Sequence, residues 1–237
     1  SIPNLSDHSQ KSFELNFTGE LEGKNYPDIQ WVAGISSYDD DNSGTFGDAL
    51  FLFGGLLQKT PMRDFTNVTT AKAIYADIAV DLGGGWGLTV GGRYTKDKRK
   101  LTVKQCIDNA YPWSARDSSN FMDRSAYICD YSDPRVAAYN GVLQAVFGDL
   151  WVYSGLFPTD FFDTSTLEAL GTRTSIDTDE FTSRVVLDFQ YTDEIMFYAS
   201  IADSFKGGGW ASRVSKAAEF KDLKPEFVDN FEMGVKS

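Results

Sequence analysis

The stretch that decides the fold begins at residue 193 as DEIMFYASIADSFKGGG and resumes at residue 225 as PEFVDNFEMGVKS. In the second segment, Phe231, Met233 and Val235 alternate with polar and charged residues. Because successive side chains of a β-strand point to opposite faces, this segment predicts a strand with one apolar and one polar face. The first segment alternates less regularly, with Phe197 and Ile201 on one face. We expect an antiparallel pair of strands whose apolar face meets either a protein core or a lipid bilayer.

Composition bounds the class of protein without deciding between these two environments. The chain has 237 residues, enough for one large domain or two small ones with a sizeable core. Hydrophobic residues make up 42%, which suits soluble proteins and also membrane-spanning β-barrels, whose polar lumen residues dilute the average. The formal net charge of −12 argues against nucleic acid as a partner, because phosphate binding requires Lys and Arg.

Five earlier segments alternate in the same way, and they predict seven strands in all. They cover residues 12–21, 29–38, 72–82, 86–103 and 181–191. The run Gly83-Gly84-Gly85 between the third and fourth segments predicts a tight hairpin. The fourth segment continues into a fully polar run at residues 96–100, as a strand would that projects beyond a membrane into solvent.

The lengths of the connections separate into two groups. Short turns fall near Gly23, Gly84 and Asp193, whereas long loops cover residues 39–69, 105–177 and 207–224. If neighbouring strands pair antiparallel, the two groups lie at opposite ends of the sheet, which is the layout of an outer-membrane barrel. Such barrels close with an even number of strands, so we expect these seven to be part of a larger wall and of a longer chain. No run of about 18 apolar residues predicts a transmembrane helix.

The first long loop opens with the acidic run Asp39-Asp40-Asp41-Asn42. Such oxygen ligands suit Ca²⁺, but their spacing does not match an EF-hand loop, and a solvated acidic turn is the alternative. We predict no metal site in the chain. Residues 46–57 are apolar and predict a short helix or a lid.

The longest loop, residues 105–177, has its own helical pattern and many aromatic residues. The helix is expected to begin at Asp133-Pro134 and to end near Gly148. The aromatic residues form either a small private core of the loop or contacts with a ligand.

Two cysteines, Cys106 and Cys129, flank an irregular part of this loop. A disulfide bond in an oxidising compartment is the simplest interpretation, and two reduced thiols are the alternative. The single histidine, His8, and one cysteine pair make a poor zinc site.

Five segments resemble sequence motifs of the TonB-dependent outer-membrane receptors. Residues 198–208, YASIADSFKGG, resemble the family's strand YASVSRGFKSGG, and residues 223–237 are similar to its L-x-P-E and N-x-E-x-G-x-K-S signature. Residues 86–95, 31–35 and 12–15 look like the family's W-x-L-T-x-G-x-R-Y-T, W-x-A-G and S-x-E-L strands. The positions carried over as structural motif residues are Phe205, Lys206, Gly207, Gly208, Pro225, Glu226, Glu232, Gly234 and Lys236.

The resemblance implies an all-β fold, an antiparallel transmembrane barrel of 22 strands with a plugged lumen. Residues 1–237 would form part of its wall without the plug domain, and one of the long extracellular loops would contain a short helix. The implied location is the outer membrane of a Gram-negative bacterium.

The function implied by the resemblance is energy-coupled uptake of a scarce nutrient that the extracellular loops capture. Iron–siderophore complexes are the family's commonest substrates, and cobalamin and oligosaccharides are others. Partners would be outer-membrane lipid, a TonB-type energy-transducing complex acting through the plug, and a small chelate or sugar. The sequence predicts no enzyme activity and no cofactor. A passive porin and a soluble β-sandwich binding module are the competing hypotheses.

Six residues are candidates for ligand binding. The loop candidates are Trp113, Tyr127, Trp151 and Tyr153, whose rings suit a bulky chelate or sugar rings. On the predicted polar face, Arg93 and Arg184 either attract an anionic chelate or pair with wall carboxylates. The carboxylates in question belong to Glu14, Asp77 and Asp188.

Overall fold

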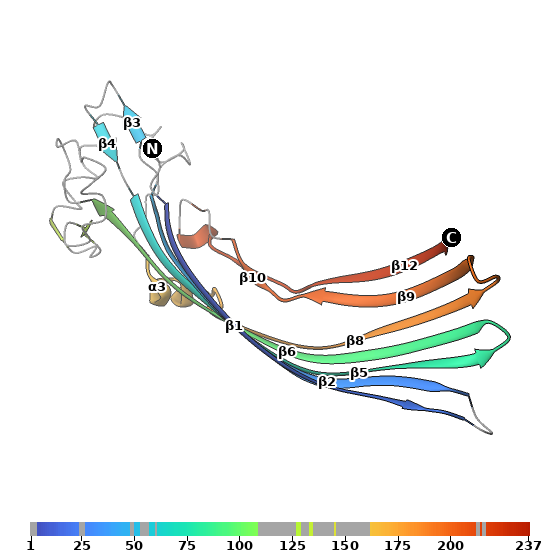
Figure 1. Cartoon of the computed structure of the whole chain (residues 1–237). Helices are drawn as coiled ribbons and strands as arrows, with labels where there is room; N and C mark the ends of the chain where they lie inside the picture. The colour runs from blue at the N-terminus through green and yellow to red at the C-terminus, as the bar shows by residue number, and fades with distance from the viewer. Residues whose placement is uncertain are drawn as a thin grey trace.

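The structure of the chain is a computed structural model that describes residues 4–23, 27–47, 50–52, 57–59, 61–108, 127–128, 133–134, 145, 162–211, 214 and 217–237. Seven long strands lie side by side in one curved sheet (Figure 1). They are β1 (Asn4–Leu21), β2 (Ile29–Gly47), β5 (Pro61–Gly83), β6 (Trp86–Asp108), β8 (Ser175–Gln190), β9 (Met196–Lys206) and β12 (Glu226–Lys236). Each pairs antiparallel with the next in chain order, which confirms the predicted seven-stranded antiparallel wall.

Short elements lie between the long strands. They are β3 (Leu50–Leu52), β4 (Leu57–Lys59), β7 (Tyr127–Ile128), α3 (Thr164–Ala169), β10 (Gly209–Trp210), η3 (Ala217–Glu219) and β11 (Asp222–Leu223). β3 pairs with β4, β10 pairs with β11, and β7 extends the sheet beside the end of β6. Among the described residues, no helix is long and apolar enough to cross a membrane.

Cross-strand register decides which side chains share a face of the sheet. Leu15 lies opposite Ile35, Ile35 opposite Ile74, and Ile74 opposite Tyr94, so these four side chains point to the same side. The same reasoning across the sheet defines the outer band: Phe13, Leu15, Phe17, Trp31, Ala33, Ile35, Ile74, Ala76, Ile78, Leu88, Val90, Tyr94, Phe181, Val185, Leu187, Phe197, Ala199, Ile201, Phe231, Met233 and Val235.

The outer band is too apolar and too exposed for a surface in water. Ile74 is 60% exposed and Phe231 is 64% exposed, and neither side chain has a protein core to enter. Soluble proteins rarely expose apolar patches larger than a few hundred Å². From Trp86, which lies on the same face at the short-turn end, to Tyr94, the apolar side of β6 runs about 27 Å, at about 3.4 Å per residue. That length matches the apolar belt of transmembrane barrels, which is about 25 Å tall.

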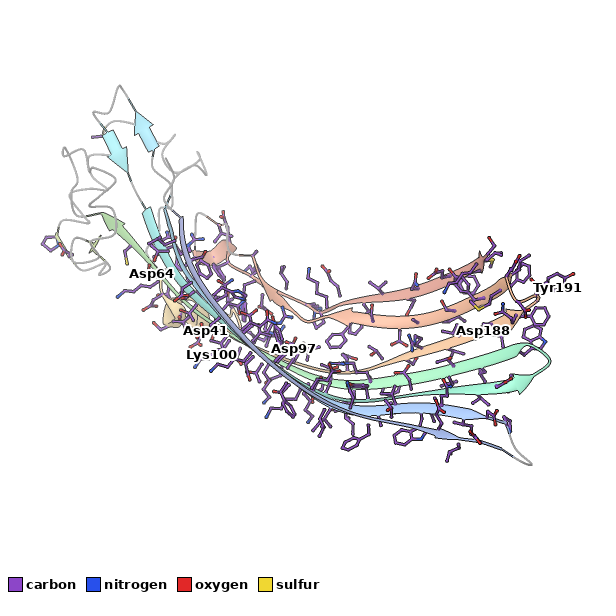
Figure 2. All side chains as sticks on the ribbon, in the orientation of Figure 1. Asp41, Asp64, Asp97, Lys100, Asp188 and Tyr191 are labelled. Carbon is purple, nitrogen blue, oxygen red and sulfur yellow. The ribbon has the colours of Figure 1, made fainter. Side chains whose placement is uncertain are left out.

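An aromatic cluster closes the band at the short-turn end. The rings of Trp86 and Phe189 lie 4.6 Å apart, and Tyr191 lies 6.4 Å from both Phe189 and Phe197. Figure 2 shows Tyr191 at this end of the sheet, three residues beyond Asp188 of β8. Aromatic rings with a polar edge favour the boundary between lipid and water, so the cluster has the composition of an interfacial girdle.

The connections between the long strands fall into short turns at one end of the sheet and longer segments at the other, as the sequence predicts. The turn after β5 uses Gly83, Gly84 and Gly85, whose φ angles of 79°, 63° and 84° are strained for residues with a Cβ. This turn and the one at residues 191–195 lie at one end of the sheet, and β3 and β4 lie at the other (Figure 1). β7 also lies at that other end, because it pairs with the last residues of β6.

Two predictions about the first long loop are wrong. Residues 39–47 and 61–69 belong to β2 and β5, which stay paired from Ile29↔Val80 to Gly47↔Met62. Within β2 the run Asp39-Asp40-Asp41 alternates between faces, so its carboxylates cannot converge as they would in a calcium turn or a solvated acidic turn. The predicted short helix over residues 46–57 is also wrong where the chain is described, because residues 50–52 and 57–59 are the antiparallel strands β3 and β4.

The other long loops are described only in part. Most of the helix predicted between residues 133 and 148 lies outside the described residues. The structure instead adds α3, which sequence reasoning missed. β8 begins at Ser175, six residues earlier than predicted, because Ser175↔Lys100 pairing with β6 extends it.

Two adjacent valines in β8 test which face meets lipid. Val185→Arg in the outer band is expected to destabilise the folded barrel by about 2–4 kcal/mol, because it buries a guanidinium in the apolar belt. Val186→Arg, its neighbour on the opposite face, is expected to change stability little. The measurement is urea unfolding of the complete receptor folded in lipid vesicles. Equal losses for the two variants would contradict the assignment of faces.

Candidate functional site

The candidate site is a hollow of about 290 Å³ on the face opposite the outer band. It lies between β5, β6, β8 and β9, and we call it the inner hollow. Its charged lining includes both arginines predicted from the sequence, Arg93 and Arg184, together with Asp77 and Asp203. These residues come from strands far apart in the chain, and the register of the sheet brings them together.

Arg184 is held by an ion pair across an intervening glycine. Asp77, Gly91 and Arg184 lie in one cross-strand row on β5, β6 and β8. A Cβ on Gly91 would overlap the carboxylate of Asp77, so only glycine lets the two charged groups meet over β6. The Arg184 Nη2 atom lies 2.6 Å from Asp77 Oδ1. Of the alternatives for Arg184, the structure therefore shows pairing with Asp77.

Arg93 contacts neutral groups. Its Nε donates to the Thr95 hydroxyl at 3.1 Å, and its Nη2 donates to the Ser36 hydroxyl at 2.9 Å. Its Cζ lies 5.4 Å from the centre of the Tyr75 ring, within range of a cation–π contact. Within the described part of the chain no carboxylate forms an ion pair with Arg93. The predicted alternative in which Arg93 pairs with a wall carboxylate is therefore not seen among the described residues.

The Tyr75 ring, beneath Arg93, is fixed by two side chains of β1, which lies beyond β2 in the sheet. Its hydroxyl contacts Glu14 and Asn16 on β1. It reaches them by crossing Gly34, where an added Cβ would lie 2.6 Å from the Tyr75 hydroxyl oxygen. Glu14 is thus engaged by a tyrosine and not by an arginine. The third carboxylate considered, Asp188, lies beside Gly87 near the short-turn end.

β8 and β9 separate at the edge of the inner hollow. Their pairing ends at Arg184↔Ala202, although β8 continues to pair with β6. At this fork the Asp203 carboxylate accepts hydrogen bonds from the Ser183 backbone N–H at 3.0 Å and from its hydroxyl at 2.5 Å. The Asp203 carboxylate replaces the backbone carbonyl that would accept from Ser183 if the β8–β9 pairing continued. The Ser183 backbone N–H therefore keeps a hydrogen-bond acceptor.

An apolar cluster, the inner cap, covers the same face closer to the long loops. It consists of Leu101, Val103, Phe162, Leu167, Ala217 and Phe220. The cluster joins β6 to the segments around α3 and η3, and Leu167 and Phe220 are at most 1% exposed. Two parts of the chain that approach from different loops therefore pack on one strand above the inner hollow.

Polar contacts hold the inner cap to the wall. The Arg63 guanidinium on β5 donates to the Gln105 side chain at 2.9 Å and to the Val214 carbonyl at 2.7 Å. Arg63 also lies over the Phe162 ring, 5.1 Å from its centre. The Thr172 hydroxyl donates to the Phe220 carbonyl at 2.8 Å. These bonds satisfy groups that the cap removes from water.

Two carboxylates fix the segments that carry the cap. Asp163 caps the N-terminus of α3, and hydrogen bonds from the Ser165 hydroxyl and the Thr166 backbone hold its pKa below the usual value. Asp222 accepts from the Arg173 guanidinium, which lies 2.6 Å away and lowers the pKa of Asp222. Both contacts stabilise the fold above the ordinary carboxylate pKa and are lost as pH falls through the lowered value.

Four residues of the recognised motifs meet in one cluster on the inner face. Tyr198 on β9 lies opposite Gly234 on β12, and its ring occupies the space that a Cβ would take. Its hydroxyl donates to Glu232 at 2.6 Å, and the Lys236 ammonium lies 5.3 Å from its ring centre. The spacing Glu-x-Gly-x-Lys therefore surrounds Tyr198 with a hydrogen-bond acceptor, Glu232, a space for its ring at Gly234, and a cation, Lys236.

The remaining motif residues lie at the end of β9 and around the start of β12. Lys206 and Glu226 lie opposite each other and form an ion pair of 3.7 Å, while Phe205 lies opposite Phe227. An added Cβ on Gly207 would lie 2.9 Å from the Arg99 guanidinium. One on Gly208 would lie 2.6 Å from the Leu223 carbonyl oxygen, so both glycines permit close packing. Pro225 directly precedes β12.

Several predicted site residues cannot be placed at the hollow. Trp113, Trp151 and Tyr153 lie outside the described residues, as does Cys129. Tyr127 is in β7, where its backbone pairs with Asp108, but its side chain is not described. Cys106 is buried at the end of β6, and the predicted disulfide with Cys129 stays a prediction. Within the described part of the chain, no three acidic, His or Cys side chains gather as a metal site would require.

Sequence reasoning missed Tyr75, Ser36 and Asp203 as parts of the site. A signal exists for Tyr75, because glycines at inner-face positions leave gaps that a cross-strand aromatic ring fills. The signal becomes readable only after the register is known, since it depends on which residue lies opposite each glycine.

A double-mutant cycle tests the tyrosine–glycine contact. Gly234→Val is expected to destabilise the barrel by about 1–3 kcal/mol, because the new side chain displaces the Tyr198 ring. In a Tyr198→Ala background most of that loss should disappear. Gly209→Val is the control, since an added Cβ there meets no atom within 4 Å. Additive losses, measured by urea unfolding in vesicles, would show that the ring does not occupy the gap.

Comparisons with known proteins agree with this geometry. The family model of the TonB-dependent receptor-like β-barrel matches residues 3–237. The crystal structure of the ferric yersiniabactin uptake receptor FyuA from Yersinia pestis superposes with a TM-score of 0.58 at 11% identity, over 99% of this chain and 27% of that one. The siderophore receptor PiuA from Acinetobacter baumannii gives a TM-score of 0.56 at 11% identity, over 98% and 29%.

At such low identity the two structures establish the fold alone, and this chain spans less than a third of their length. No curated protein matches the chain in sequence. The family model nevertheless covers nearly every residue, including all seven strands of the wall and the motif cluster around Tyr198. The chain therefore belongs to the TonB-dependent receptor β-barrel family.

Proposed function

We propose that this chain forms part of the barrel wall of an energy-coupled outer-membrane receptor that imports an iron–siderophore complex. The observation that carries the substrate class is the inner hollow, where Arg93 presents a guanidinium to the lumen. Ferric chelates are commonly anionic, and a guanidinium recognises carboxylate and phenolate-type oxygens through directed hydrogen bonds. The two similar solved structures, a ferric yersiniabactin uptake receptor and a siderophore receptor, support the same class.

Arg93 is suited to this role because its neighbours do not neutralise it. A guanidinium has five N–H donors, and the structure shows two of them on the hydroxyls of Ser36 and Thr95. Arg184 differs, since the Asp77 carboxylate already neutralises its charge. We therefore assign ligand attraction to Arg93 first and a supporting position to Arg184.

The remaining parts of the proposal follow from family membership. The loops that carry Trp113, Tyr127, Trp151 and Tyr153 capture the chelate at the cell surface. Transfer through the barrel is driven by a TonB-type complex that pulls on a plug held in the lumen. The predicted Cys106–Cys129 disulfide would stabilise the longest loop in this oxidising location.

An arginine variant tests the inner hollow. In the complete receptor, Arg93→Gln is expected to weaken binding of an anionic ferric chelate about tenfold or more, as expected for loss of a charge-assisted hydrogen bond. Binding is measured by quenching of intrinsic fluorescence at two salt concentrations. Arg173→Gln is the matched control, because it removes the same charge from a pair with Asp222 in the loops. Equal affinity of Arg93→Gln and the parent receptor would contradict the site.

Replacement of the loop aromatics tests capture. Substitution of Trp113, Tyr127, Trp151 and Tyr153 by alanine is expected to lower chelate affinity about a hundredfold, because aromatic contacts dominate such surfaces. A control replaces Trp86 and Tyr191 at the opposite end of the barrel.

Uptake of radiolabelled iron by cells should also cease when an uncoupler collapses the proton-motive force. Uptake that continues would indicate a passive porin.

A further inference from the structure

Arg93 is held over the sheet by side chains that carry no charge. It lies on β6 directly opposite Tyr75 on β5, and Tyr75 lies opposite Gly34 on β2. The guanidinium extends over the Tyr75 ring and reaches the Ser36 hydroxyl on β2, which lies 2.9 Å from Nη2. The Arg93 side chain therefore spans the width of β5, and the Tyr75 ring is the surface on which it lies.

The Tyr75 ring is itself held in place on the side away from Arg93. It crosses Gly34, where an added Cβ would lie 2.7 Å from the ring carbon that bears the hydroxyl. Beyond that glycine the hydroxyl donates to the Glu14 carboxylate on β1. A phenol that donates to a carboxylate has a more electron-rich ring, so the contact with Glu14 strengthens the attraction of the ring for a cation.

A support without charge leaves the charge of Arg93 available to a ligand. A free arginine side chain samples many rotamers, and an anion that binds it must offset the entropy lost when one rotamer is fixed. A carboxylate partner would fix the side chain but would also neutralise it, as Asp77 does for Arg184 in the same hollow. Tyr75 and Ser36 fix Arg93 and leave it cationic, so an anion meets a guanidinium that is already oriented.

The same arrangement occurs a second time in the sheet, at a distance from the inner hollow. Tyr198 on β9 crosses Gly234, donates to Glu232 and lies beneath the ammonium of Lys236. That tyrosine lies nearer to the short turns than the β9 residues that line the inner hollow. What distinguishes Tyr75 is that the cation above it lines the hollow, so Tyr198 provides a matched control.

We propose that Tyr75 positions Arg93 for the imported chelate. The ring holds the guanidinium in the orientation that meets an anionic oxygen, and Glu14 fixes the ring through its hydroxyl. Tyr75 acts through Arg93 and needs no contact with the chelate. The inference rests on the proposed function, since it takes Arg93 to bind the chelate, but the hold of Tyr75 on Arg93 can be measured without any chelate.

The binding test uses the complete receptor and two ferric probes, a trianionic triscatecholate complex and an uncharged trishydroxamate complex. Tyr75→Leu is expected to weaken calorimetrically measured binding of the trianionic probe about tenfold, because the cation–π contact and the orientation of Arg93 are lost together. Tyr75→Phe keeps the ring and should weaken it about threefold, because only the hydrogen bond to Glu14 is lost. Binding of the uncharged probe should change much less.

A double-mutant cycle separates positioning from a general effect on the fold. In an Arg93→Gln background, Tyr75→Leu should have little further effect on affinity for the trianionic probe, because the two residues act as one unit. Tyr198→Leu is the control, expected to lose stability in urea as Tyr75→Leu does and to bind the probe as tightly as the parent receptor.

A second measurement needs no chelate. Phenylglyoxal modifies accessible guanidinium groups, and mass spectrometry of the digested receptor gives the rate at each arginine. Tyr75→Leu should raise the rate at Arg93 severalfold, because the ring no longer covers one face of the guanidinium. The rate at Arg173, which pairs with Asp222 in the loops, should stay the same.

Two results would overturn the inference. One is additive losses of affinity from Tyr75→Leu and Arg93→Gln, and the other is an equal phenylglyoxal rate at Arg93 in the parent and in Tyr75→Leu. A parent receptor that binds neither probe would contradict the proposed substrate class instead. The phenylglyoxal rates would then still decide whether Tyr75 holds Arg93.

Discussion

Cross-strand register is the constraint on which the rest of this structure depends. Six antiparallel pairings keep the outer band continuous over seven strands, from Phe13 to Val235. Because side chains alternate with a period of two, a slip of one residue in any pairing would turn that strand's apolar residues inward and its charged residues toward lipid. Burial of charge in lipid costs several kcal/mol per residue, so each pairing is strongly selected.

Glycines paired with aromatic rings reinforce the register on both faces. Tyr75 crosses Gly34 and Tyr198 crosses Gly234 on the inner face, while Trp31 lies over Gly19 on the outer face. Each ring fits only where the facing residue lacks a side chain, so a shifted strand would bring the ring against a Cβ. The two inner tyrosines also donate to a glutamate and lie under a cation, Arg93 or Lys236. The family signature around Gly234 is thus explained by packing and hydrogen bonding within the wall.

Alternation in the sequence was sufficient to predict the strands within the membrane belt, their number and the separation of short turns from long loops. It failed at the strand ends, where β2 continues through Asp39-Asp40-Asp41 although aspartate disfavours strands. Those residues are held by ladder bonds to β5, and a partner strand leaves no trace in the local pattern. The inner cap was equally hidden, because Leu101, Phe162 and Phe220 are distant in sequence. Asp77 was one of three carboxylates open to the arginines, and its choice as the partner of Arg184 required the knowledge that Gly91 lies between them.

The apolar side of β6 changes as the strand leaves the membrane belt, and this change links the site to the wall. Up to Tyr94 the apolar residues point outward and polar residues such as Arg93 point inward. Beyond that level Lys96, Lys98 and Lys100 point outward, whereas Leu101 and Val103 point inward and are buried in the inner cap. β6 therefore has two successive amphipathic stretches, and the apolar face of the second stretch is on the opposite side of the sheet from that of the first. Lipid takes the first apolar face and the folded loops take the second. Arg93 and Arg184 lie on the polar stretch below the inner cap, so the inner hollow lies directly below the level at which the apolar face of β6 changes sides.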